Sequence, residues 1–145
     1  MVHWDGKLLP DLTGKDLVDR LPIIVSGADV QQLLGVPKLP GGTGELMANA
    51  IHTTLEQWGL EDRVKCQCFD TTSSNTGHMN GACVLLEQKL GHQMLHFACR
   101  HHVHEIVLEA VTVTCLGPST GPDIALFKRF QGQCGNSSTR RNLKF

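Results

Sequence analysis

The sequence predicts an α/β fold in which early strands precede an alternation of strands and helices. Short apolar runs rich in β-branched residues occupy the first part of the chain, and longer stretches with helical spacing follow them. A length of 145 residues fits a single domain. An apolar fraction of 41% and a charged fraction of 19% are those of a folded protein rather than a disordered one.

Three early segments are predicted to be strands. Residues 2–12 read as one strand that Pro10 and Asp11 loosen at its end, residues 20–27 as a second, and residues 33–37 as a weaker third. The glycine and proline of the third segment favour a sheet edge or a strand end. Consecutive short strands of this kind most simply form an antiparallel meander.

The clearest helix is predicted after the glycine-rich loop at residues 41–44. Thr43 fits its N-cap, and Gly59 fits a left-handed C-terminal end. The apolar residues at helical spacing, which we expect in the core, are Met47, Ile51, Leu55 and Trp58.

Strands and helices then alternate to the end of the predicted sheet. Residues 64–69 form a strand, 82–90 a helix, 94–99 a largely buried strand and 103–114 a helix that Gly117 and Pro118 stop. Strands joined by helices in this way should be parallel on the same sheet. Residues 117–145 are predicted to add a short helix and a disordered tail.

Charge and composition exclude several classes of function. Thirteen basic and fourteen acidic side chains give a net charge of −1, so any binding of nucleic acid must be local. No apolar stretch approaches the roughly 18 residues of a membrane helix, and the first residues do not resemble a secretory signal. We therefore expect a nuclear or cytoplasmic protein that is not secreted and has no membrane partner, with reduced cysteines.

Two acids stand where strands of the predicted sheet end. Asp5 lies in the first strand, and Asp70 ends the strand at residues 64–69. If these strands are neighbours, the two carboxylates converge on one cation, and magnesium accepts such ligands together with water and phosphate. Two such ions can promote phosphodiester cleavage. The residues alone favour a simpler interpretation, in which Asp70 caps the strand or the following turn.

Thiol and imidazole groups are concentrated on the strand at residues 64–69 and around the end of the next predicted strand. They are Cys66, Cys68, His96, Cys99, His101, His102 and His104. A tetrahedral zinc site can be drawn from them, but Cys-x-Cys is not the usual zinc spacing and reduced cysteine is common in protein cores. Zinc is therefore disfavoured, as is a thiol nucleophile at Cys99. The basic residues near the carboxyl terminus are more simply a solvated tail than a phosphate contact.

Three segments resemble the catalytic domain of hAT-superfamily DNA transposases and of host proteins derived from them. They read HWDGK, TGELMANAIHTTLEQWGLEDRVKCQCFDTTSSNTG and MLHFACRHHVHEIVL. Asp5 matches the family's acid in the first strand, Asp70 the acid before a small–Ser–Asn loop, and Cys99 with His102 its Cys-x-x-His. The resemblance covers residues 1–116, and residues 117–145 follow this partial catalytic domain.

The resemblance implies a ribonuclease H-like α/β fold, with three antiparallel strands and then parallel strands in a mixed sheet flanked by helices. It also implies an Asp-Asp-Glu triad that binds two magnesium or manganese ions and cleaves and transfers DNA strands. Asp5 and Asp70 would be its first two metal ligands, and Cys99 and His102 would position DNA. The implied partners are DNA and a second copy of the chain, with no small-molecule cofactor.

The chain departs from this family's pattern at several points. We find no zinc-binding DNA reader, no helical insertion and no third acid, because Glu105 and Glu109 come too early for the family's Glu. We therefore expect a truncated fragment or remnant of a transposase core that is inactive alone, and its status as an enzyme stays open. The alternative is a domesticated module that binds DNA or protein without catalysis.

Overall fold

A computed structural model describes residues 1–11, 14 and 16–118 of the chain. The chain divides into two compact units, residues 1–103 and 104–145. The first unit contains two β-sheets and the helices that cover one of them, and within the second unit the described residues are mostly helical. The helix and tail predicted for residues 117–145 lie outside the described residues beyond position 118.

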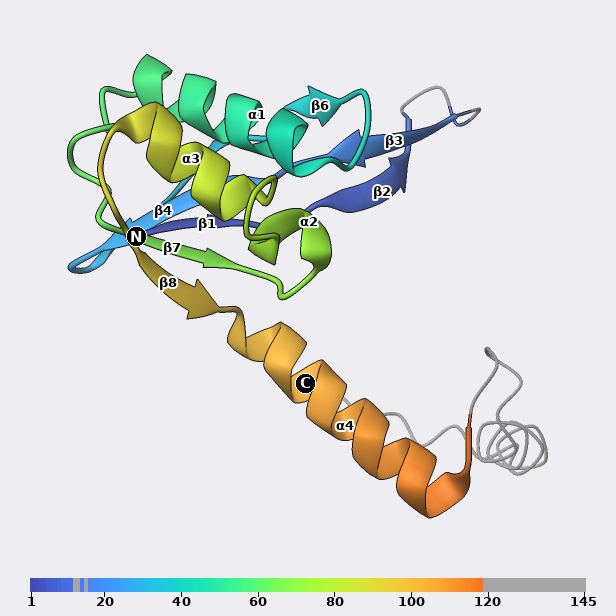
Figure 1. Ribbon diagram of the computed structural model, residues 1–145. Coiled ribbons are helices and arrows are strands. Elements are labelled where there is room, and N and C mark those ends of the chain that lie inside the picture. Colours follow the sequence, from blue (N-terminus) through green and yellow to red (C-terminus); the bar gives the residue numbers. More distant parts are fainter. Residues whose placement is uncertain (12–13, 15, 119–145) are drawn as a thin grey trace, which may run out of the picture. The chain divides into compact units, whose positions relative to one another are not determined.

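A five-stranded mixed sheet forms the centre of the first unit (Figure 1). Its strands, in spatial order, are β5 (Val30–Gly35), β4 (Ile23–Gly27), β1 (Val2–Trp4), β7 (Cys66–Phe69) and β8 (Leu95–Ala98). Strand β4 pairs antiparallel with β1 and β5, whereas β7 pairs parallel with β1 and β8. The predicted α/β class and the sequence of antiparallel and then parallel strands are confirmed, as is the edge position of the third predicted strand.

The first predicted strand is wrong in its extent. Strand β1 ends at Trp4, and the chain then leaves the main sheet to form a second antiparallel sheet from β2 (Lys7–Pro10), β3 (Leu17–Arg20) and β6 (Lys38–Leu39). Asp5 and Gly6 both disfavour continued strand structure, which explains the break. Pro22 has no N–H to donate to a ladder, and it lies between β3 and β4.

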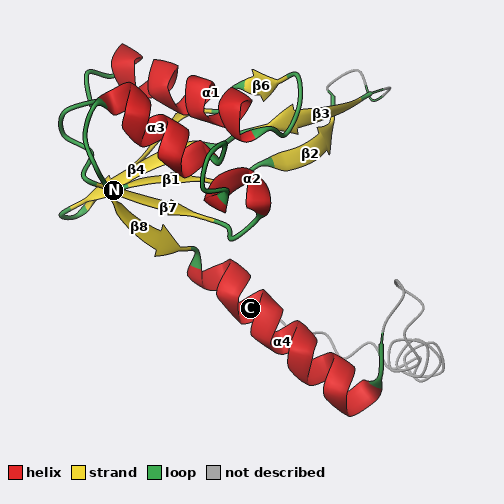
Figure 2. Ribbon diagram, in the orientation of Figure 1, coloured by secondary structure: helices red, strands yellow, loops and turns green. Residues whose placement is uncertain are grey.

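Two helices cover one face of the main sheet (Figure 2). Helix α1 (Gly44–Gln57) begins as predicted, because the Thr43 hydroxyl accepts a hydrogen bond from the Leu46 N–H at 3.4 Å. Helix α3 (Ala82–Leu90) ends at Gly91, which has a left-handed φ of 71°. The short helix α2 (Ser73–Thr76) follows Asp70 closely, in the segment where the sequence predicts a loop.

The core lies between these helices and the sheet. Met47, Ile51 and Leu55 of α1 are buried there, as predicted. Trp58 is not, since its side chain is 49% exposed and its indole N–H donates to the Leu34 carbonyl at 3.2 Å. Trp58 is the C-cap of α1 and keeps the helical backbone, but at the end of the helix its indole reaches the edge strand β5 instead of the core.

Strand β8 differs from its prediction as a largely buried strand. All of its residues are exposed, with Leu95 at 64% and Phe97 at 47% exposure. In the described part of the chain, β8 is an edge strand paired only with β7, and α1 and α3 pack on one sheet face. The apolar run of β8 therefore does not show that both faces of this strand are buried.

Helix α4 (Arg100–Leu116) begins earlier than predicted and ends before Gly117, as expected. Many of its apolar side chains are exposed, among them Ile106 and Leu108. None of the helices described is long and apolar enough to cross a membrane.

Candidate functional site

The two predicted acids stand at the same edge of the main sheet. Strands β1 and β7 are adjacent and parallel, with Val2 paired to Gln67 and His3 to Cys68. Asp5 comes directly after β1 and Asp70 directly after β7. Each acid comes two residues after a paired position, since His3 pairs with Cys68. The predicted adjacency of the two strands is thus present in the fold.

A dense set of hydrogen bonds holds the Asp70 carboxylate. Its Oδ1 atom accepts from the Thr72 N–H at 3.1 Å, from the Thr72 hydroxyl at 2.6 Å and from the Asn75 side-chain amide at 2.6 Å. Burial by itself acts to raise the pKa of Asp70, but the hydrogen bonds from Thr72 and Asn75, together with the charge of His102, outweigh it. The pKa of Asp70 is therefore held below its usual range.

Asp5 has a different environment. Its carboxylate is exposed and forms an ion pair with Lys7, with 3.0 Å between Oδ2 and Nζ. Because both side chains are open to solvent, this pair contributes little to stability and can open readily. Asp5 thus remains accessible to another cation.

The predicted pair Cys99 and His102 lies beside Asp70. The Cys99 N–H donates to the Phe69 carbonyl at 2.8 Å, which extends the β7–β8 ladder to the residue before Asp70. His102, in the first turn of α4, acts electrostatically on the Asp70 carboxylate. Burial and the adjacent Cys99 thiol raise the pKa of Cys68. The structure therefore brings Asp70, Cys99 and His102 together.

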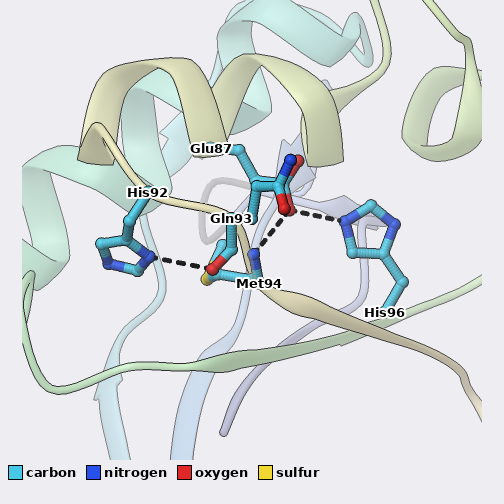
Figure 3. Close-up of polar contacts among 5 residues, drawn as sticks. All are labelled: Glu87, His92, Gln93, Met94 and His96. Carbon is cyan, nitrogen blue, oxygen red and sulfur yellow. Dashed lines mark hydrogen bonds and ion pairs between the residues drawn. The ribbon is translucent and has the colours of Figure 1, made fainter.

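Glu87 anchors the segment that leads into β8 (Figure 3). Its Oε1 atom accepts from the Met94 N–H at 2.7 Å and from the His96 ring at 2.9 Å. His96 in turn presents its ring to the edge of Phe69, with 5.8 Å between ring centroids. These contacts fix the start of β8, and through it the position of Cys99.

Asn75 was not predicted as a site residue. Its side chain is buried, with only 2% of the residue exposed, and it links Asp70 to the Trp4 indole, whose N–H donates to Asn75 Oδ1 at 2.9 Å. The acid–small–Ser–Asn pattern that supports the resemblance already contained this residue. No local pattern in the sequence indicates that Asn75 accepts a hydrogen bond from Trp4.

The donor atoms at this edge fit a hard divalent cation only in part. Two carboxylates, with water and phosphate, can hold magnesium or manganese. Among the described residues, no hydrogen bond reaches Asp70 Oδ2, which leaves that oxygen for a cation. However, no three His, Cys, Asp or Glu side chains in the described ranges are grouped so that they could hold a metal ion. The protein groups found here would supply part of a coordination shell.

Stability at acidic pH should depend on Asp70. Because its pKa is lower in the folded state than in the unfolded chain, the ionised carboxylate stabilises the fold above its unfolded pKa, and this contribution is lost as pH falls through the folded pKa. We expect the free energy of unfolding to fall below about pH 4, and to fall less steeply in Asp70→Asn. Urea denaturation at a series of pH values measures both slopes.

The exposed turn residue Asp62 supplies the control for this experiment. Asp62→Asn should retain the acid dependence of the wild-type protein. Equal slopes in wild type and Asp70→Asn would contradict the assignment of this stability to Asp70.

Asp5, Asp70, Cys99 and His102 thus follow the carboxyl ends of three adjacent parallel strands, where α/β sheets commonly bind ligands. Carboxylates here can bind a cation, and the imidazole can contact a phosphate or exchange a proton. In comparisons with known proteins, the sequence matches no protein family and no curated protein.

Proposed function

We propose that the chain carries the first two metal-ligating acids of a ribonuclease H-like, hAT-type DNA transposase core. The parent chemistry is divalent-metal-dependent cleavage and transfer of DNA strands. The observation that carries the proposal is that Asp5 and Asp70 directly follow adjacent parallel strands. The mixed sheet, with its antiparallel strands before its parallel ones, also supports it.

In this proposal each site residue has a stated role. Asp5 and Asp70 hold a magnesium or manganese ion, whose remaining ligands are water and a DNA phosphate oxygen. The metal ion supplies activation of the attacking oxygen and stabilisation of the leaving one. Cys99 and His102, beside Asp70, contact the DNA strand near the bond to be cut. A DNA partner accords with a nuclear or cytoplasmic location.

The chain by itself is expected to lack cleavage activity. The described residues provide no third metal ligand at this edge, so the ion is bound weakly and its position is poorly fixed. The missing acid has to come from outside the described residues.

A second candidate function is a DNA- or protein-binding module without catalysis. It is favoured by the Asp5–Lys7 ion pair, which occupies one of the two acids, and by the hydrogen bonds that tie Asp70 to the turn before α2. In this role the carboxylate of Asp70 stabilises the turn and need not meet a cation.

Manganese binding separates the two functions. We expect the wild-type chain to bind Mn²⁺ with a dissociation constant of roughly millimolar order, as for weak carboxylate sites. Asp70→Asn should weaken this binding by about 10-fold or more, because it removes the charge that holds the ion. Electron paramagnetic resonance of free Mn²⁺ during a titration measures both affinities.

Asp62→Asn is the matched control, since it removes an equal charge from an exposed turn. If the wild type and Asp70→Asn bind Mn²⁺ equally, or if the wild type binds none, the metal site is rejected and the non-catalytic binding module is supported. Plasmid nicking by the wild type with Mn²⁺, absent from Asp70→Asn, would show that the chain holds a complete catalytic set.

A further inference from the structure

Two consecutive hydrogen bonds, one buried and one partly buried, connect the first strand to the Asp70 carboxylate. The Trp4 indole N–H donates to Asn75 Oδ1 at 2.9 Å, and Asn75 Nδ2 donates to Asp70 Oδ1 at 2.6 Å. Trp4 is 3% exposed and Asn75 2% exposed, so water competes little for the bond between them, whereas the bond from Asn75 to Asp70 is partly buried. The link crosses from β1 to α2, which lies at the end of β7 in Figure 1.

The chemistry of the groups fixes the direction of this link. An indole N–H only donates, so the atom of Asn75 that faces Trp4 has to be its oxygen. The amide NH₂ of Asn75 is thereby turned towards Asp70, where it meets an acceptor. The opposite orientation would place two donors together at Trp4 and two acceptors together at Asp70. Trp4 therefore selects one orientation of the Asn75 amide.

The selected orientation also sets how Asp70 presents its two oxygens. Oδ1 accepts one hydrogen bond from Asn75 and two from Thr72. These three bonds saturate Oδ1 as an acceptor and stop the carboxylate from rotating. Oδ2 receives no hydrogen bond from the described residues. The carboxylate thus has one oxygen held within the turn and one left to bind.

The ring of Trp4 extends the same coupling to the strands. It stacks on Phe69, with 5.4 Å between ring centroids and 27° between ring planes. Trp4 immediately precedes Asp5, and Phe69 immediately precedes Asp70. One stacked pair therefore sets the positions from which both acids leave the sheet.

We infer that Trp4 and Asn75 are positioning residues, which form an indole–amide relay that holds Asp70 Oδ1 in the turn and directs Oδ2 outward as a monodentate ligand. That the group bound by Oδ2 is a divalent metal ion rests on the proposed function. The relay itself rests on the hydrogen bonds and burial of the two side chains. Neither residue touches the cation.

Nuclear magnetic resonance tests the relay without any metal. The chain has two tryptophans, so a ¹⁵N-labelled sample gives two indole N–H signals. Asp70→Ala removes the acceptor at the far end of the relay and alters no atom of Trp4 or Asn75. We expect it to shift the Trp4 indole signal, because the Asn75 amide loses its anchor, and to leave the Trp58 signal in place. An unshifted Trp4 signal overturns the relay.

Manganese titration of the full chain tests what the relay does for the site. Asn75→Ala should weaken Mn²⁺ binding by about 10-fold, as loss of the groups that orient a metal ligand commonly does. Trp4→Phe keeps an aromatic ring beside Phe69 but removes the N–H together with part of the buried indole, so it should also weaken binding. Trp58→Phe is the control, since that indole donates to Leu34 and lies outside the relay.

The outcomes separate the relay from the proposed function. Wild-type Mn²⁺ affinity in both Asn75→Ala and Trp4→Phe overturns the positioning role. If the wild type binds no Mn²⁺ but the Trp4 signal responds to Asp70→Ala, the metal site fails and the relay is retained. Spectra of each variant show whether it has folded.

Discussion

Gly44→Ala is expected to lower the free energy of unfolding by about 3 kcal/mol, the upper part of the usual range for overpacking. A Cβ atom at Gly44 would lie 2.2 Å from the Asn80 carbonyl oxygen, 2.6 Å from that of Ser74 and 2.8 Å from the Ala82 nitrogen. These are backbone atoms, so no side-chain rotation can relieve the contact. Either α1 or the segment joining α2 to α3 has to move. Urea denaturation of the variant measures the loss.

Gly27→Ala provides the matched control. No heavy atom lies within 4 Å of a Cβ atom at Gly27, and its φ is outside the left-handed region. This variant should stay within about 0.5 kcal/mol of the wild type. If the two alanine variants unfold at the same urea concentration, the close approach of α1 to the α2–α3 segment does not exist in solution.

This close approach also bears on the candidate site. Helix α2 follows Asp70, contains Asn75 and supplies the Ser74 carbonyl oxygen that approaches Gly44. Gly81 also packs tightly, since a Cβ atom there would lie 2.6 Å from the Asn75 carbonyl oxygen. Because Gly44 and Gly81 have no side chain, the starts of α1 and α3 can pack closely against the segment that follows Asp70. Strain introduced at Gly44 should reach the carboxylate through this turn.

The fold could be predicted from sequence where the local signals agree with the packing. Helix α1 has a capping threonine, an apolar stripe and a glycine end, and all three signals correspond to what forms. The small sheet of β2, β3 and β6 gave no such signal. Its strands are only two to four residues long, and β2 is exposed throughout, so alternation of apolar and polar residues does not mark them.

The candidate site was predictable in part for a similar reason. Asp70 stands at the end of an apolar strand, and that position is visible in the sequence. The hydrogen bond between Trp4 and Asn75 joins residues that are 71 positions apart, and no local pattern reports such a contact. Only the pairing of β1 with β7 brings them together. Tertiary contacts therefore supply what the spacing of residues could not.

Leu86→Ala should remove about 3 to 5 kcal/mol from the free energy of unfolding, as large-to-small changes in a rigid core do. Leu86 is fully buried in α3 and belongs to the core cluster between the helices and the sheet. Its truncation leaves a cavity that α1 and the strands cannot close without moving. Chemical denaturation of both proteins gives the difference directly.

Leu95→Ala makes the same chemical change on β8, where the leucine is 64% exposed. It should cost no more than about 0.5 kcal/mol, because little apolar area is lost from the folded state. The difference between the losses of unfolding free energy in Leu86→Ala and Leu95→Ala tests whether the sheet is covered on one face only. A cost at Leu95 close to that at Leu86 would mean that β8 is buried in solution by a partner or by residues outside those described. Asp70 and Cys99, which flank the end of β8, would then belong to a more enclosed site than this structure shows.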